Sequence, residues 1–195
     1  MIRLIADSTC DLGSDIAREL DITILPLYIT LGDRRGRDGT EITSEDIYAW
    51  ADSTKSTPKT SAFSIADAMD CIRPMVEAGD DIIFVGISEK MSASCQVMRL
   101  AAEEFLWSEH THVINSENLS NGLAILLLHA VKLIRDGLPA AEIAQTLRGM
   151  TGRLHSNFIV TRSPILPAAD AVRRRPRCWP TPSASSRRLS SPTAV

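Results

Sequence analysis

The chain has 195 residues, of which 44% are apolar and 23% charged, and its formal net charge at pH 7 is −3. This length accommodates one ordinary domain and part of a second, and the composition is that of a core-forming globular protein. A membrane-inserted protein is not expected, because the longest apolar run, Leu123–Leu128, is far shorter than the roughly 20 residues that cross a bilayer.

Short apolar runs alternate with helical periods along residues 1–161. The first predicted elements are a buried strand at Ile2–Ala6, a helix at Gly13–Leu20 with Ile16, Ala17 and Leu20 on one face, a strand at Ile22–Leu31 and a turn at Gly32–Gly36. Pro26 lies inside the second strand. It marks an edge position or a bulge, because proline cannot donate to a strand ladder.

Capping residues mark the helices that follow, and Thr43 and Ser64 each resemble an N-cap. The remaining predicted elements are a helix after Thr43 with Ile47, Trp50 and Ala51 buried, a helix from Ser64 to Ala78, a central buried strand at Ile82–Ile87, a helix at Met91–Trp107 with Val97, Leu100, Ala101 and Phe105 inward, a strand at His112–Ile114, helices at Leu119–Arg135 and Ala140–Leu154, and a last strand at His155–Val160. Strands that alternate with helices predict an α/β fold with a parallel sheet.

Hydroxyl-rich loops follow several of the predicted strands. They are Asp7–Asp11, Ser88–Ser94 and Asn115–Gly122, and a fourth hydroxyl-rich loop, Thr60–Ser64, opens a predicted helix. The carboxyl ends of parallel strands share one edge of an open α/β sheet, and ligands bind at that edge. Hydroxyl donors and helix N-termini together stabilise a negative charge. The sequence therefore predicts a binding site for an anionic group.

The same hydroxyls have two other interpretations. Ser8, Thr9 and Asp11 could cap the helix at Gly13–Leu20, and Ser92 and Ser94 could cap the helix that follows them. The Thr60–Ser61 pair is harder to explain as a cap, because Ser64 is better placed. A loop serine could also be the nucleophile of a hydrolase or transferase, but the sequence has neither a G-x-S-x-G elbow nor a positioned base.

The cysteines and histidines show no pattern that holds a metal. Cys10, Cys71, Cys95 and Cys178 are scattered without a C-x-x-C pair, and the four histidines have neither metal nor Ser–His–Asp spacing. Reduced thiols and the lack of a signal peptide predict a cytoplasmic protein, and we expect no metal or other cofactor.

Six segments in a fixed order resemble the DegV family of bacterial fatty-acid-binding proteins. They are Asp7-Ser8-Thr9-x-Asp11-Leu12, Pro26-Leu27-Tyr28-Ile29, Arg37-Asp38-Gly39-x-Glu41-Ile42-Thr43, Thr60-Ser61 with Ser64, Ser88-x-Lys90-Met91-Ser92-Ala93-Ser94, and Asn115-Ser116 with Ser120-x-Gly122-Leu123. Together they cover about residues 1–161, which is far more specific than any one of them. The resemblance makes residues 1–161 the first, parallel-sheet domain of a DegV-type protein.

The resemblance also implies a function without catalysis. Family members hold a long-chain fatty acid between two domains, and a dihydroxyacetone-kinase-like fatty-acid kinase phosphorylates the bound acid. Carried over to this sequence, Thr60 or Ser61 and Ser92 would hydrogen-bond the carboxylate, with Ser8 and Thr9 near the same pocket. Ala93 stands where the family has glycine, so a requirement for positive φ there would strain the loop that presents Ser92.

Residues 162–195 differ in composition from the rest of the chain. They carry seven arginines, one aspartate and six of the ten prolines. This basic Pro/Ser/Arg-rich tail predicts disorder, and we weighed and disfavoured nucleic-acid binding because no recognition fold accompanies the charge. If the reading frame were shifted after about residue 160, the encoded residues would resemble the segment that DegV family members have at this point and that this chain lacks. We therefore expect a truncated, possibly frameshifted protein without its second domain and with impaired lipid binding.

Overall fold

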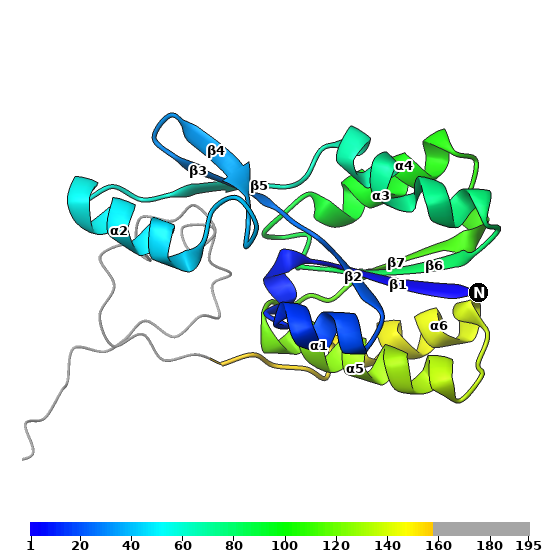
Figure 1. Cartoon of the computed structure of the whole chain (residues 1–195). Helices are drawn as coiled ribbons and strands as arrows, with labels where there is room; N and C mark the ends of the chain where they lie inside the picture. The colour runs from blue at the N-terminus through cyan, green and yellow to red at the C-terminus, as the bar shows by residue number, and fades with distance from the viewer. Residues whose placement is uncertain (158–195) are drawn as a thin grey trace, which may run out of the picture.

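The computed structural model describes residues 1–157, which form two separate sheets (Figure 1). The larger sheet is parallel and has the order β2-β1-β6-β7. Its strands are β1 (Ile2–Asp7), β2 (Ile22–Leu25), β6 (Asp81–Gly86) and β7 (Thr111–Asn115). The predicted α/β fold with a parallel sheet is confirmed.

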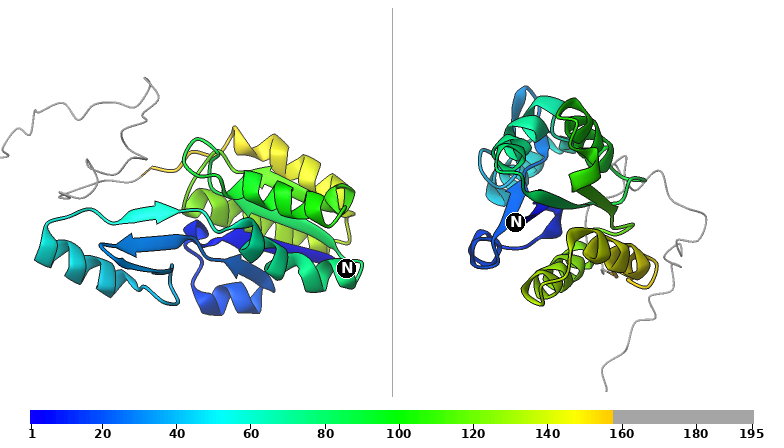
Figure 2. Two further views of the ribbon diagram at one scale, coloured as in Figure 1. Left: turned by 90° about the horizontal axis from the view of Figure 1, so that it is seen from above. Right: turned by 90° about the vertical axis from the view of Figure 1, so that its right-hand side faces the viewer.

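Helices cover both faces of this sheet (Figure 2). One face carries α1 (Ser14–Glu19), α5 (Asn121–Arg135) and α6 (Ala140–Thr151), and the other carries α3 (Ile65–Glu77) and α4 (Ser94–Glu104). Side chains of β6 alternate between the two cores: Ile83 and Val85 pack with α5 and α6, whereas Ile82 and Phe84 pack with α3 and α4. This double burial is why β6 has a continuous apolar sequence.

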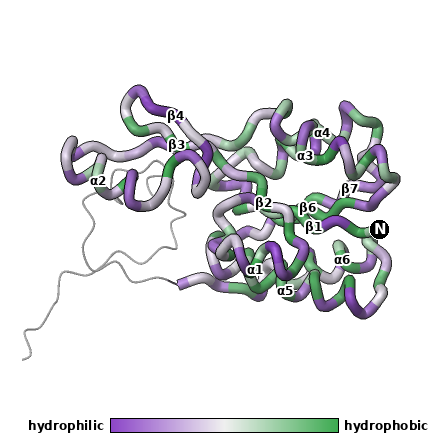
Figure 3. Tube along the Cα trace, in the orientation of Figure 1, coloured by the Kyte–Doolittle hydropathy of each residue, from purple (hydrophilic) through white to green (hydrophobic). Residues whose placement is uncertain are grey.

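A small lobe projects from one end of the parallel sheet (Figure 1). We define it as residues 28–61, which comprise β3 (Tyr28–Leu31), β4 (Arg34–Arg37), α2 (Ser44–Thr54) and β5 (Lys59–Ser61). The strands form an antiparallel sheet with the order β4-β3-β5. Ile29, Leu31 and Ile42 pack against α2 in a core of their own, while β4 is hydrophilic (Figure 3).

The structure corrects two predictions in this region. The single strand predicted at Ile22–Leu31 is wrong, because β2 and β3 belong to different sheets. Pro26 lies between them and cannot donate to a ladder, so the chain leaves the parallel sheet there. The turn predicted at Gly32–Gly36 is restricted to Gly32 and Asp33, and β4 begins at Arg34.

Helix ends and inward faces were predicted less accurately than the helices themselves. The helix predicted at Met91–Trp107 is α4, which begins at Ser94 and ends at Glu104. Its Leu100 was predicted to face inward but is exposed, as is Ile16 of α1. Of the strand predicted at His155–Val160, residues 155–157 are in no strand. Residues 158–160 lie outside the described residues, as do the predicted boundary after residue 161 and the basic tail.

A close approach between β6 and α4 requires Gly86. A Cβ atom at this position would lie 2.7 Å from both Cys95 Sγ and Phe84 Cε1 in the buried core. We expect Gly86→Ala to lower the free energy of unfolding by about 1–3 kcal/mol through overpacking, measured by chemical denaturation. Gly149→Ala in α6 is the matched control, because nothing lies within 4 Å of its Cβ position. The control should be stabilised by about 0.5–1 kcal/mol, and equal effects of the two substitutions would contradict the packing argument.

Candidate functional site

The loops that follow β1, β6 and β7 meet at the carboxyl edge of the parallel sheet. Asp7 Oδ2 accepts a hydrogen bond from the Ile87 N–H at 2.8 Å, which joins the first loop to the second. The Ser120 N–H donates to the Thr9 carbonyl at 2.9 Å, and the Ser88 N–H donates to the Asn118 carbonyl at 2.9 Å. Three of the four hydroxyl-rich loops that the sequence predicts to converge therefore meet at this edge, whereas Thr60 and Ser61 of the fourth lie on β5.

Asp7 is the central connection at this edge. Its side chain is fully buried and also accepts from the N–H and hydroxyl of Thr9. Burial raises the pKa of the Asp7 carboxyl, and the hydrogen bonds from Thr9 and Ile87 oppose that shift without cancelling it. Both oxygen atoms of the Asp7 carboxyl therefore accept hydrogen bonds that hold the loops together.

The hydroxyls of Ser8 and Thr9 are both occupied within the protein. The Ser8 hydroxyl donates to Asp38 Oδ2 at 2.7 Å and accepts from the Leu27 N–H at 3.2 Å, while the Thr9 hydroxyl donates to Asp7. The capping interpretation of these two residues is wrong, because the N-cap of α1 is Gly13 and no side chain accepts a hydrogen bond from the first N–H groups of this helix.

Ser92 lies just before α4 in a different electrostatic environment. Its Oγ is 2.8 Å from Ser94 Oγ and accepts from the Ser94 N–H at 3.3 Å, and neither partner is charged. The N-terminus of α4 begins two residues later, so the helix dipole favours an anion beside Ser92. Ala93 has a φ of −86°, so this position does not need glycine and the predicted loop strain is absent.

Thr60 and Ser61 lie on β5, in the small lobe, and not at the start of a helix. In the antiparallel sheet Thr60 pairs with Ile29, and Ser61 pairs with Tyr28. Successive side chains of a strand point to opposite faces, so Thr60 shares the face that packs on α2 and Ser61 the other face. Both residues are exposed. Only one of the two hydroxyls can therefore face a given ligand.

The helix after β5 begins as predicted. Ser64 and Asp67 form a capping box at the start of α3. Asp67 also accepts from the Tyr28 hydroxyl at 3.1 Å and from the Arg37 guanidinium at 3.1 Å. Burial raises the pKa of the Asp67 carboxyl, but the hydrogen bonds from Ser64, Tyr28 and Arg37 outweigh burial and lower it.

The part of the chain that the structure describes shows no metal site, no histidine bonded to a candidate serine and no membrane-spanning helix. Residues 1–157 contain no group of three His, Cys, Asp or Glu side chains that could hold a metal ion. The hydrogen bonds of Ser8 and Ser92 go to no histidine, and His110 pairs with Asp81 at the opposite, amino end of β6. None of the helices in these residues is long and apolar enough to cross a membrane.

Comparison with known sequences identifies relatives of this chain. The model of the DegV family of uncharacterised proteins matches residues 1–166. The chain is 30% identical over 146 residues to a DegV domain-containing protein of Clostridium perfringens, in an alignment that covers 75% of this chain and 52% of the relative. A second such protein, from Clostridium acetobutylicum, is 32% identical over 142 residues, with 73% and 50% covered. The chain thus spans about half the length of the curated relatives it matches.

Solved structures give the same result. The chain is similar to a fatty-acid-binding DegV family protein of Thermus thermophilus, with a TM-score of 0.71 and 30% identity over 77% of this chain and 53% of the other. It is also similar to a stearic-acid-binding protein of Eubacterium ventriosum, with a TM-score of 0.68 and 28% identity over 75% and 52%.

Proposed function

The chain belongs to the DegV family, and on that basis we propose that it binds a long-chain fatty acid and performs no catalysis itself. The observation that carries this proposal is Ser92, a hydroxyl with uncharged partners beside a helix N-terminus at the edge where three loops meet. Neutral donors there can hold a carboxylate without another fixed charge.

The carboxylate ligands in this proposal are Ser92 and one of the two β5 hydroxyls. Thr60 and Ser61 point to opposite faces of the small lobe's sheet, so only one of them joins Ser92. Ser8 and Thr9 follow β1 at the carboxyl edge of the parallel sheet, and their hydroxyls already donate to Asp38 and Asp7. Long aliphatic chains bind through burial of apolar surface, and the carboxylate contributes the selectivity for the headgroup.

The partner in this proposal is a dihydroxyacetone-kinase-like fatty-acid kinase. Hydrogen bonds from hydroxyls leave the carboxylate oxygen atoms chemically available, so a kinase could convert the bound acid to an acyl phosphate. We place the protein in the cytoplasm, which agrees with the free thiols of Cys10, Cys71 and Cys95 among the described residues.

The test compares two probes that differ only in the headgroup. Oleate and oleyl alcohol are titrated into the delipidated full chain, and the two dissociation constants are measured. A carboxylate site predicts that oleate binds at least about tenfold more tightly, because hydrogen bonds to a charged group contribute roughly 1.5–3 kcal/mol. Equal affinities would contradict a carboxylate site, and binding of neither probe would contradict the proposed function.

A further inference from the structure

We infer that Ser8 and Asp38 form a positioning link, which orients the small lobe on the parallel sheet, and that neither residue binds the carboxylate. The importance of this link for ligand binding rests on the proposed function. Its mechanical role can be measured without a ligand.

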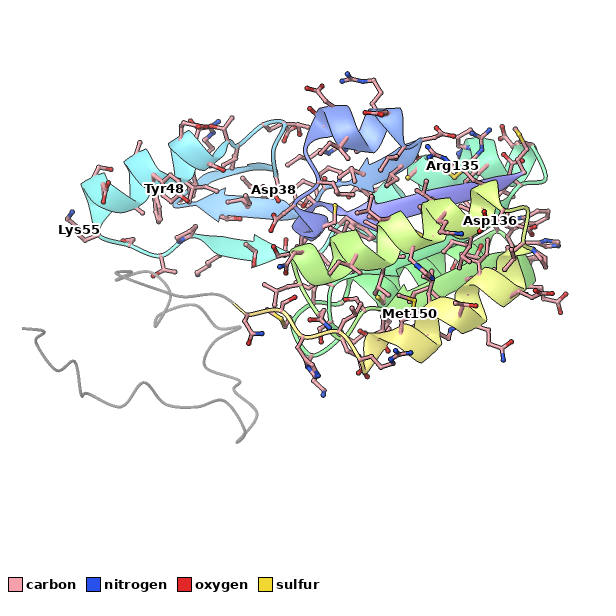
Figure 4. All side chains as sticks on the ribbon, turned by 90° about the horizontal axis from the view of Figure 1, so that it is seen from below. Asp38, Tyr48, Lys55, Arg135, Asp136 and Met150 are labelled. Carbon is pink, nitrogen blue, oxygen red and sulfur yellow. The ribbon has the colours of Figure 1, made fainter. Side chains whose placement is uncertain are left out.

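The link joins three segments that are far apart in the sequence. Ser8 follows β1, Leu27 lies in the connection from β2 to β3, and Asp38 follows β4. The Ser8 hydroxyl donates to the Asp38 carboxylate at 2.7 Å and accepts from the Leu27 N–H at 3.2 Å. The Asp38 N–H in turn donates to the Leu27 carbonyl at 2.9 Å. Asp38 lies where the small lobe meets the parallel sheet (Figure 4).

A second contact joins the small lobe to α3, the helix that follows β5. Asp67 of α3 accepts from the Tyr28 hydroxyl and from the Arg37 guanidinium, each at 3.1 Å. Tyr28 is the first residue of β3 and follows Leu27 in the chain. The Ser8–Asp38 link and the Asp67 contact therefore both hold the amino end of β3, the central strand of the lobe. β5 pairs with β3, and its hydroxyls therefore take their position from this strand.

Charge argues against a ligand carboxylate at Ser8. The only hydroxyl proton of Ser8 is already donated to Asp38, and a second carboxylate on Ser8 would lie beside the Asp38 carboxylate. Like charges at such short range in a partly buried site repel strongly. Within residues 1–157 the Ser92 hydroxyl has no such neighbour, because its hydrogen-bond partners are the hydroxyl and the N–H of Ser94. Ser8 is thus a positioning residue, and it acts through the lobe that carries Thr60 and Ser61.

Paired substitutions separate this role from direct binding. Ser8→Ala and Asp38→Ala remove the link, whereas Ser8→Thr keeps the donor and Asp38→Asn keeps an acceptor oxygen. The preference for oleate over oleyl alcohol should fall about tenfold in each alanine variant, equivalent to one misplaced hydrogen bond, and should persist in Ser8→Thr and Asp38→Asn. The double alanine variant should lose no more than either single one, because both remove the same contact.

Three outcomes would overturn the inference. If Ser8 bound the carboxylate directly, Ser8→Ala would weaken oleate binding while Asp38→Ala would leave it unchanged or strengthen it. If the link were needed only for folding, both probes would lose affinity together. The third outcome is unchanged amide hydrogen exchange of β3 and β5 in Asp38→Ala, since the link predicts faster exchange there and wild-type exchange in Asp38→Asn. Faster exchange in a protein without headgroup preference would refute the proposed carboxylate site and leave the link intact.

Discussion

Replacement of Asp7 by asparagine is expected to lower the free energy of unfolding by about 1–3 kcal/mol, the cost of leaving a buried donor unsatisfied. The Asp7 carboxyl uses one oxygen for the Ile87 N–H and the other for Thr9. An amide has only one acceptor oxygen, so its NH₂ group must face one of these donors. The measurement is chemical denaturation of both proteins at pH 7.

Asp11→Asn is the control for this experiment. Asp11 is an exposed neighbour with a φ of 53°, a conformation that asparagine tolerates. Its substitution should change stability by less than about 0.5 kcal/mol. If Asp7→Asn were equally mild, the connection between the first two loops would not contribute to the fold.

The pH dependence of Asp7→Asn has a defined sign. Because burial raises the pKa of Asp7, the folded protein binds a proton at this carboxyl more tightly than the unfolded chain does. The associated stability is fully present below the carboxyl's unfolded pKa and is lost as the pH rises through the folded one. The deficit of the asparagine variant relative to wild type should therefore grow as the solution is acidified, and a shrinking deficit would contradict the raised pKa.

Ser92→Ala has the largest expected effect on ligand binding. Loss of a hydrogen bond to a charged group should weaken oleate binding by about 10- to 100-fold and leave oleyl alcohol binding nearly unchanged. Of Thr60→Ala and Ser61→Ala, only one should have a comparable effect, because the two side chains lie on opposite faces of the lobe's sheet. Equal losses in both would contradict the strand assignment of β5.

Ser53→Ala provides the matched control for the serine variants. Ser53 is exposed on α2, and among the described residues its hydroxyl bonds only the Trp50 carbonyl of its own helix. Oleate affinity should not change in this variant. A Ser92→Ala protein that loses affinity for both probes would indicate a disturbed loop and not a missing carboxylate ligand.

Much of the parallel-sheet region could be predicted from local patterns. The apolar run at Ile82–Ile87 indicated a strand covered on both faces, and Ile82–Val85 are fully buried in the structure. Thr43 and Ser64 indicated helix starts, and each forms a capping box with the aspartate three residues later. These features depend on residues close in sequence, which is why the sequence alone identifies them.

The small lobe was predicted poorly because its signals are not local. β4 has the sequence Arg34-Arg35-Gly36-Arg37, which carries no apolar alternation, and its one pairing partner within residues 1–157 is β3. The break at Pro26 depends on two sheets that the periodicity of one segment cannot distinguish. Strand pairing over long separations decides both features.

The sequence predicted that the loops after β1, β6 and β7 meet, but not how their residues bond to one another. It singled out the hydroxyls of Ser8, Thr9 and Ser92 as candidates and could not show that those of Ser8 and Thr9 already have partners. The deciding contacts join Asp7 to Ile87 and Ser8 to Asp38, which are 80 and 30 residues apart. The sequence feature that could have indicated these contacts is the aspartate in each of two short motifs, Asp7 and Asp38, because a carboxylate removed from water requires hydrogen-bond partners.

Mass spectrometry of the purified full chain tests the central claim most directly. The account predicts a noncovalent adduct with the mass of a long-chain fatty acid under native conditions, which disappears on denaturation to leave the mass of the unmodified 195-residue chain. An acyl or phosphoryl adduct that survives denaturation and maps to Ser8 or Ser92 would contradict the account, because it would identify a serine nucleophile and hence an enzyme.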